Sequence, residues 1–197
     1  MAKKAKSKAK RSLTQRPTLL HEKRALGKGH KSIAGVDESG VGPLAGPVVA
    51  AAVILKRHKF KNRIDDSKRL TPEKRLRAYK EILKNSVYST AVVNHRVIDR
   101  INIYNAVKLA MENAIKKLRT KPDYVLIDGI MKLSIPYRGY SIKKGDRYCL
   151  SIACASIIAK VVRDRIMCRI HKDYPQYGFR KHKGYGVPAH FQALKMR

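Results

Sequence analysis

Apolar and polar positions change their period several times along the chain, and each change predicts a new element. "GPVVAAAVIL" (46–55) is continuously apolar and rich in valine and alanine, which is typical of a strand buried on both faces. "SIAGVD" (32–37) predicts a strand just before it, and "SVYSTAVV" (86–93) predicts another. Two further strands are each expected to end in an aspartate: "PDYVLIDG" (122–129), ending in Asp128, and "YRGYSIKKGD" (137–146), ending in Asp146.

Between these strands, apolar residues recur at helical spacing. "TPEKRLRAYKEIL" (71–83) predicts a helix with Thr71 as N-cap and Pro72 at its first position. Its apolar positions are Leu76, Tyr79, Ile82 and Leu83. Other helices are expected over 18–26, over 95–118 as one or two segments, and over 149–170, with a polar loop at 65–70 and a basic, aromatic loop before a short final helix in 174–197.

The order of these elements predicts an α/β domain of three layers, in which helices flank a mixed sheet. We expect this single domain over 17–197, after a disordered basic arm over 1–16. Binding sites in open α/β sheets form at the carboxyl ends of strands. Acidic residues stand at three predicted strand ends: Asp37 with Glu38, Asp128, and Asp146.

Charge then narrows the class of partner. The chain carries 45 Lys and Arg against 14 Asp and Glu, a formal net charge of +31. The first 32 residues hold 11 of these bases and one acid, so the rest of the chain is strongly basic as well. A polyanion such as a nucleic acid is the expected partner, because each neutralised phosphate releases counterions. Charge alone does not separate an enzyme from a basic nucleic-acid-binding protein without chemistry.

Other sequence features exclude some classes. No apolar run reaches 18 residues, which predicts no membrane span. Cys149, Cys154 and Cys168 are odd in number and lack the paired spacing of a zinc site, which favours buried thiols and a reducing, cytoplasmic location.

The stretch "GVDESGVGPLAGPV" (35–48) places two acids directly before a glycine loop. Its glycines follow a GxGxxxG spacing and Pro43 interrupts the helix start, so a dinucleotide-binding loop is disfavoured. Carboxylates beside a phosphate repel it unless a cation lies between them, and Mg²⁺ is held in this way. Asp37, Glu38, Asp128 and Asp146 are enough to bind two such ions, which can activate a water and stabilise the leaving oxygen of a phosphodiester.

Several blocks together resemble one known family. They are "IAGVDESGVGPLAGPVVAAAVIL", "DDSKRLTPEKR", "YVLIDG", "KKGD", "SIACASIIAKVVRDRIM" and "YPQYGFRKHKGYG". In this order, from about residue 20 to 195, they resemble the signature blocks of bacterial ribonuclease HII. The resemblance implies a ribonuclease H-like fold with a mixed five-stranded sheet flanked by helices. It also implies endonucleolytic cleavage of the RNA strand of RNA/DNA hybrids and cleavage 5′ of a single ribonucleotide in duplex DNA, leaving 3′-hydroxyl and 5′-phosphate ends, in ribonucleotide removal from DNA.

The resemblance also implies roles for individual residues. The acidic quartet of the family maps onto Asp37, Glu38, Asp128 and Asp146, with Mg²⁺ or Mn²⁺ in a two-metal site. The loop Gly40–Val41–Gly42 would contact the ribose 2′-hydroxyl, the group that distinguishes RNA from DNA. Tyr185 would pack on the sugar of the next deoxynucleotide. The candidate phosphate contacts are Lys68, Arg180, Lys181, His182 and Lys183.

Some features depart from the family pattern or leave alternatives open. Val41 stands where the family has arginine, so an arginine contact to nucleic acid is absent. Asp164 is expected in a structural ion pair within its helix, not among the metal ligands. The chain stops soon after "HFQAL", where the family continues through a basic segment, which predicts weaker substrate binding. An inactive nucleic-acid-binding homologue and another nuclease or transposase of the same fold are the alternatives. A monomer is expected, and the sequence predicts no particular protein partner.

Overall fold

The computed structural model describes residues 16–196 and is built on one five-stranded sheet of order β3–β2–β1–β4–β5. Its strands are β1 (Ile33–Ser39), β2 (Val48–Leu55), β3 (Ser86–Val93), β4 (Tyr124–Asp128) and β5 (Arg138–Ile142). The pairs β1–β2 and β2–β3 are antiparallel, whereas β1–β4 and β4–β5 are parallel, so the expected mixed sheet is confirmed.

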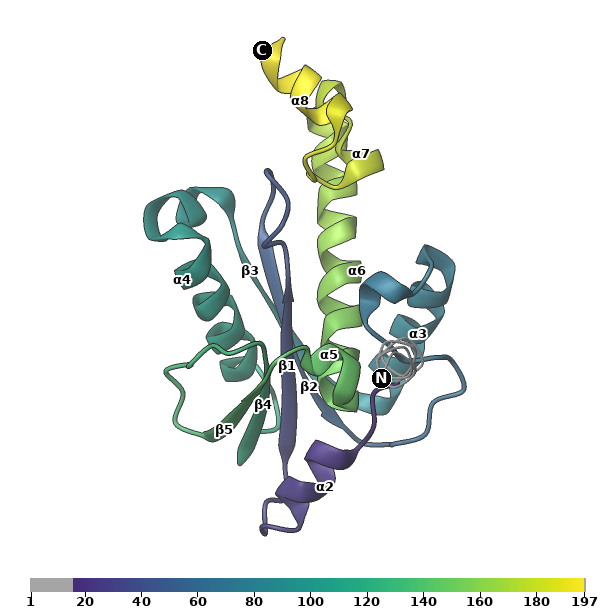
Figure 1. The fold of residues 1–197 in the computed structure, drawn as a ribbon, viewed down its shortest axis with the longest axis vertical. Helices are drawn as coiled ribbons and strands as arrows, with labels where there is room; N and C mark the ends of the chain where they lie inside the picture. Colours follow the sequence, from purple (N-terminus) through teal and green to yellow (C-terminus); the bar gives the residue numbers. More distant parts are fainter. Residues whose placement is uncertain (1–15, 197) are drawn as a thin grey trace, which may run out of the picture.

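Helices cover both faces of this sheet and make three layers (Figure 1). On one face, α4 (His95–Lys116) buries Ala106, Ala110 and Met111 against apolar side chains of β1, β2 and β4. On the other face, α3 (Pro72–Asn85) and the long α6 (Leu150–Asp173) form a second core with β2. The all-alanine centre of β2 is buried on both sides, as its continuous apolar run predicts.

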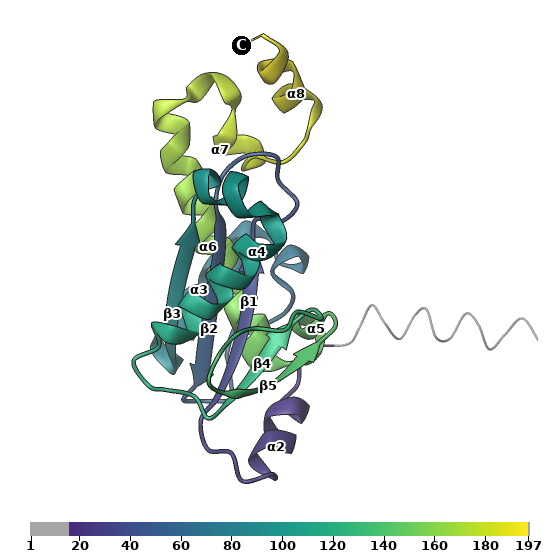
Figure 2. The same ribbon diagram turned by 90° about the vertical axis from the view of Figure 1, so that its left-hand side faces the viewer.

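Short elements complete the described chain. They are α2 (Leu20–Leu26), the 3-10 helix η1 (Ser67–Arg69), α5 (Gly145–Tyr148), the 3-10 helix η2 (Pro175–Tyr177), α7 (Phe179–His182) and α8 (Pro188–Lys195). Figure 2 shows α2 and α5 on the β4–β5 side of the sheet. Of the predicted basic arm, only Arg16 lies within the described residues. No helix in residues 16–196 is long and apolar enough to cross a membrane.

Local capping explains why α3 begins where the sequence predicts. The Thr71 hydroxyl accepts a hydrogen bond from the Lys74 N–H (3.3 Å), and Pro72 occupies the first helical position. The buried face of α3 consists of Ala78, Tyr79 and Ile82, whereas Leu76 is 38% exposed.

Two expectations are wrong, one about a loop and one about the length of a strand. Residues 65–70 are not a plain polar loop: Asp65 and Asp66 are buried, and Asp66 caps η1 by accepting from the Lys68 N–H (3.0 Å). Asp65 is held there by Arg63 and Arg69. The strand predicted over 137–146 ends at Ile142, because Lys144 adopts a left-handed conformation (φ 59°) and Gly145 begins α5. Asp146 therefore stands in a short helix beyond the strand end.

Helix α4 is one element with a break inside it. Asn102 has φ 64° and ψ 168°, which is not helical, and its side-chain oxygen accepts from the Asn105 N–H (3.1 Å). This hydrogen bond caps the second segment as an N-cap asparagine does. The alternative of one or two segments over 95–118 is thus answered by two segments joined at Asn102.

Candidate metal centre

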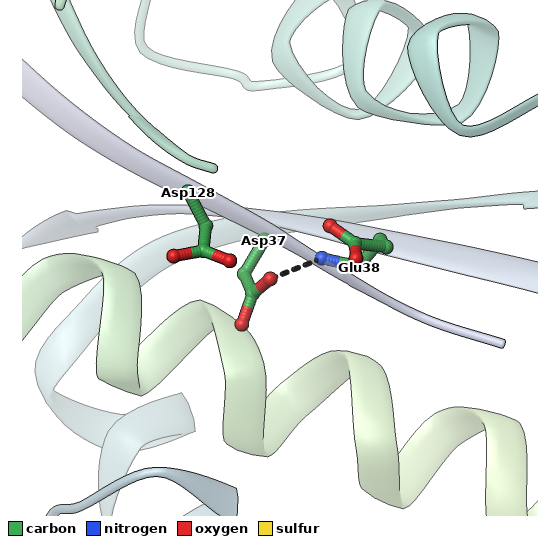
Figure 3. A group of neighbouring side chains, drawn as sticks. All are labelled: Asp37, Glu38 and Asp128. Atoms are coloured by element: carbon green, nitrogen blue, oxygen red, sulfur yellow. Dashed lines mark hydrogen bonds between the residues drawn. The ribbon is translucent and has the colours of Figure 1, made fainter. Parts of the chain in front are cut away.

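Two neighbouring parallel strands bring the first acids together. Val36 of β1 pairs with Ile127 of β4, so the next residues, Asp37 and Asp128, stand side by side where β4 ends. Asp37, Glu38 and Asp128 each offer a carboxylate oxygen, and these oxygens lie within 4.8 Å of one another. Figure 3 shows the carboxylates of Asp37 and Asp128 on the side of the sheet that faces α6. Two acids that are adjacent in the sequence, Asp37 and Glu38, therefore form one cluster with Asp128, which is distant from them in the sequence.

Backbone hydrogen bonds fix the orientation of two of these carboxylates. The Asp37 Oδ1 atom accepts from the Glu38 N–H (2.7 Å), the bond drawn in Figure 3. The Asp128 Oδ1 atom accepts from the N–H groups of Gly145 (2.5 Å) and Asp146 (3.4 Å). The first turn of α5 is thereby tied to the end of β4, which brings Asp146 to the same place.

Asp146 joins the other acids as a wall of one small cavity of about 80 Å³. The turn at Lys144 lets α5 double back over the end of β4, so Asp146 reaches the cluster although it does not end a strand. The cavity also has cationic walls, Lys68 and Lys160. Four acids and two lysines thus line a space that is large enough for metal ions and a phosphate oxygen of a bound substrate, but too small to enclose a whole nucleotide.

The electrostatics of the cluster are unfavourable without a cation. Burial raises the pKa of Asp37 well above its usual range, and the charges of Glu38, Asp128 and Asp146 raise it further. Burial also raises the pKa values of Glu38 and Asp128. The pKa of Asp146 is raised to about 7, first by burial and then by Asp66 and Asp128.

This donor set fits a hard divalent cation. The clustered donors are carboxylate oxygens, which Mg²⁺ and Mn²⁺ prefer, and a dication would compensate the repulsion that raises the pKa values. The acidic cluster therefore indicates use of a divalent metal. Asp37, Glu38, Asp128 and Asp146 are the residues that would hold it.

The glycine loop forms another wall of the cavity. Gly40, Val41 and Gly42 all line it. Gly40 has φ +126°, and a Cβ there would lie 2.5 Å from the Pro47 carbonyl oxygen, so this position needs glycine. A Cβ at Gly42 would meet only the Tyr185 ring, at 3.6 Å. The backbone at Gly42 is therefore accessible from the cavity, with Tyr185 beside it.

Two lining residues of α6, Ser156 and Lys160, were not predicted from the sequence. The Ser156 hydroxyl hydrogen-bonds the Ser67 hydroxyl (3.1 Å), and its hydrogen bond to Asp37 partly offsets the raised pKa of Asp37. The Lys160 ammonium lies 5.5 Å from the Tyr185 ring centre. The available signal was two polar residues one helical turn apart in the largely apolar first half of the helix, over 150–162.

Asp164 lies outside the cavity lining and holds Lys160 in place. Its carboxylate accepts from the Lys160 ammonium (2.6 Å) and lies 3.6 Å from the Arg75 guanidinium. The expected structural ion pair is confirmed, although its partners are not the adjacent arginines.

The predicted phosphate contacts near the C-terminus lie outside the cavity. Arg180 and Lys181 are exposed, and neither lines it. His182 stacks on His190 (4.6 Å between ring centres), and Lys183 lines a different cavity beside Arg75 and Asp164, so these two predicted phosphate contacts do not line the carboxylate cavity either.

A buried arginine ties the two loops of the site together. The Arg163 side chain is fully buried and donates to the carbonyl oxygens of Ala45 (3.0 Å), Pro47 (2.9 Å) and Lys183 (3.0 Å). Ala45 and Pro47 follow the glycine loop, and Lys183 precedes Tyr185. One side chain of α6 thus sets the position of both loops relative to the carboxylates.

Comparisons with known proteins show the family of this chain. The family model described as Ribonuclease HII matches residues 34–197. The Ribonuclease HII of Caldicellulosiruptor bescii is 51% identical over 88% of this chain and 85% of its own. That of Acholeplasma laidlawii is 50% identical over 90% and 88%. The crystal structure of ribonuclease H2 from Pyrococcus horikoshii OT3 matches with a TM-score of 0.73 and 25% identity, over 84% of this chain and 86% of that one. The chain therefore belongs to the ribonuclease HII family of endoribonucleases.

Proposed function

We propose that this protein uses Mg²⁺ or Mn²⁺ to hydrolyse the RNA strand of RNA/DNA hybrids and to cut 5′ of single ribonucleotides in duplex DNA. The products carry 3′-hydroxyl and 5′-phosphate ends, and the role is ribonucleotide removal from DNA. Membership of the family supports endonuclease action on hybrids. The observation that carries the finer proposal is the convergence of four carboxylates, one buried and three half-buried, from β1, β4 and α5, in one cavity of a chain with net charge +31.

Each wall of the cavity has a task in this reaction. A bound pair of ions would activate a water and stabilise the leaving oxygen. Asp37, Glu38, Asp128 and Asp146 hold those ions in place. Lys68 is positioned to neutralise the substrate phosphate. These contacts act in a partly buried site, where charge interactions are stronger than in water.

The glycine loop and Tyr185 recognise RNA in this proposal. The accessible backbone of Gly40–Val41–Gly42 faces the ribose 2′-hydroxyl, which is present only in RNA. Tyr185, supported by Lys160 at 5.5 Å, packs on the neighbouring sugar. Arg163 holds both groups at a fixed separation from the carboxylates. The bond that is cut is therefore chosen by its distance from a 2′-hydroxyl.

The test is cleavage of two end-labelled substrates, duplex DNA with one ribonucleotide and an all-RNA/DNA hybrid, with Mg²⁺ and separately with Mn²⁺. We expect a cut just 5′ of the lone ribonucleotide and several cuts in the hybrid. A folded protein that binds both substrates and cuts neither would favour the alternative of a basic nucleic-acid-binding protein. Cleavage of DNA without any ribonucleotide would favour another nuclease of the same fold.

Metal binding is expected to stabilise the fold in a pH-dependent way. Because the folded-state pKa of Asp146 is raised to about 7, the metal-free protein binds extra protons in its folded state and loses stability as pH rises from about 4 towards 7. Mn²⁺ should therefore raise the melting temperature strongly at pH 8 and weakly at pH 5.5, where protons compete for the carboxylates. Thermal melts at both pH values, with Asp164→Asn as the matched control, check this. An equal shift at both pH values would contradict it.

Restoring an arginine in the glycine loop is expected to strengthen substrate binding. The Val41 side chain is 50% exposed at the cavity, so Val41→Arg places a guanidinium beside the substrate backbone without disturbing the core. One added phosphate contact should make the slope of log affinity against log salt steeper by about 0.9. Binding of duplex DNA with one ribonucleotide, measured from low to high salt, checks this, with Val41→Gln as the uncharged control. An unchanged slope would contradict it.

A further inference from the structure

A second cavity, of about 260 Å³, lies between α2 and the β4–β5 edge of the sheet. Its polar and aromatic lining consists of His21, Arg24, Lys28, Tyr124 and Tyr140, and it shares no residue with the carboxylate cavity. Figure 2 shows α2 below α5 at this side of the sheet. The molecule therefore has a basic, aromatic pocket outside the candidate metal centre.

The two cavities open on the same face of β4. Tyr124, Leu126 and Asp128 alternate along this strand, so their side chains point to one side of the sheet. Tyr124 and Leu126 line the second cavity, and Asp128 lines the first. Four residues of strand span about 13 Å, and each nucleotide of a duplex strand advances about 3.4 Å. The second cavity is thus about four nucleotide steps from the carboxylates.

The charge of this cavity is positive and uncompensated. Among the residues that the structure describes, no acidic one lines it. Nearby Glu22 points inward, where its Oε1 atom accepts from the Ser151 N–H (2.8 Å). Asp123 accepts from the backbone N–H groups of Lys31 (2.7 Å) and Ser32 (3.0 Å). Burial lowers the pKa of His21, so the positive charge at neutral pH comes from Arg24 and Lys28.

The aromatic groups of the cavity are available for stacking. The Tyr140 side chain on the edge strand β5 is 56% exposed. Tyr124 is held by the His30 ring, with 4.5 Å between the ring centres. Cations that contact phosphates, next to aromatic rings that accept bases, are the combination used for single-stranded nucleic acid. A base within a duplex is already stacked and paired, so this combination favours an unpaired nucleotide.

We propose that this pocket binds an unpaired nucleotide of a single-stranded extension next to the duplex being cut, with its phosphate on Arg24 and Lys28 and its base on Tyr140. The inference rests on the proposed function, because that function places a nucleic acid at the neighbouring carboxylates. The enzyme then binds a hybrid that carries such an extension more tightly than a blunt one.

The experiment compares a blunt hybrid with hybrids carrying five-nucleotide DNA extensions at either end. The variants are Tyr140→Ala, Tyr140→Phe and Arg24→Ala/Lys28→Ala. The control is Lys117→Ala/Arg119→Ala, which removes two exposed cations after the end of α4. We expect one extended hybrid to show a KM about fivefold or more below that of the blunt hybrid. Tyr140→Ala and Arg24→Ala/Lys28→Ala lose this advantage, whereas Tyr140→Phe and the control keep it, with kcat unchanged on the blunt hybrid.

Equal KM values for blunt and extended hybrids would overturn the proposal, as would an equal loss in the control variant. Displacement of the extension by micromolar AMP, or by inorganic phosphate, would also overturn it and identify a site for a free nucleotide or phosphate. A separate binding measurement uses a labelled five-nucleotide DNA strand and metal-free protein. This measurement tests binding of the strand in the pocket even if neither hybrid is cut. A wrong assignment of the pocket can therefore be distinguished from a wrong proposed function.

Discussion

Asp128→Asn is expected to lower cleavage of an RNA/DNA hybrid by at least about 100-fold, the scale on which one preorganised electrostatic group acts. The asparagine keeps an oxygen that accepts from the Gly145 and Asp146 N–H groups, so α5 stays in place. It removes a negative charge that would hold a metal ion. Single-turnover cleavage with Mg²⁺ measures the loss.

The same substitution is expected to stabilise the metal-free protein. Burial raises the pKa of Asp128, so its ionised form costs stability above that pKa, and a neutral amide removes the cost. The metal-free melting temperature at pH 8 should rise while activity falls. Asp164→Asn, outside the cavity, should do neither to a comparable degree. A variant that is both inactive and less stable would mean that Asp128 serves the fold and not a metal ion.

Arg163→Met is expected to cause the largest loss of stability among single changes in α6. It leaves the carbonyl groups of Pro47, which is buried, and of Ala45 and Lys183, which are half-buried, without their donor, at about 1–3 kcal/mol each. A total of about 3 kcal/mol or more corresponds to a melting temperature lower by roughly 6–12 °C in a domain of this size. The kcat/KM for hybrid should fall as well, because the glycine loop and Tyr185 lose their common anchor.

Arg165→Met is the matched control, because Arg165 lies two residues after Arg163 in α6. Arg165 packs over the Tyr79 ring (4.8 Å) and makes only a long hydrogen bond to its hydroxyl (3.4 Å). Its loss should change the melting temperature by a few degrees at most and leave kcat/KM unchanged. Equal effects of the two substitutions would show that the three carbonyl contacts of Arg163 are not the source of its importance.

Much of the fold follows from local sequence patterns. Strand β2 is a continuous apolar run, strand β3 is a run bounded by polar residues, and α3 carries its own cap, so their ends are set by adjacent residues. The grouping of Asp37 with Asp128 also followed, because parallel strands bring their carboxyl ends to one edge. The register Val36–Ile127 makes these two acids neighbours.

Other features depend on contacts that local patterns do not contain. The strand expected to reach Asp146 ends early because Lys144 takes a left-handed turn, and the letters "KKGD" do not distinguish this turn from continued strand. Asn102 breaks α4 although apolar spacing continues through it. The role of Arg163 depends on Ala45 and Lys183, which are brought to it only by the tertiary fold.

The central claim is that the carboxylates at the ends of β1 and β4, with Asp146, hold divalent metal ions. Calorimetric titration of the metal-free protein with Mn²⁺ at pH 8 tests it directly, without reference to cleavage. We predict saturable binding by the native protein and by Asp164→Asn, and loss of that binding in Asp37→Asn/Asp128→Asn. Binding of equal affinity and stoichiometry in all three proteins would contradict the account.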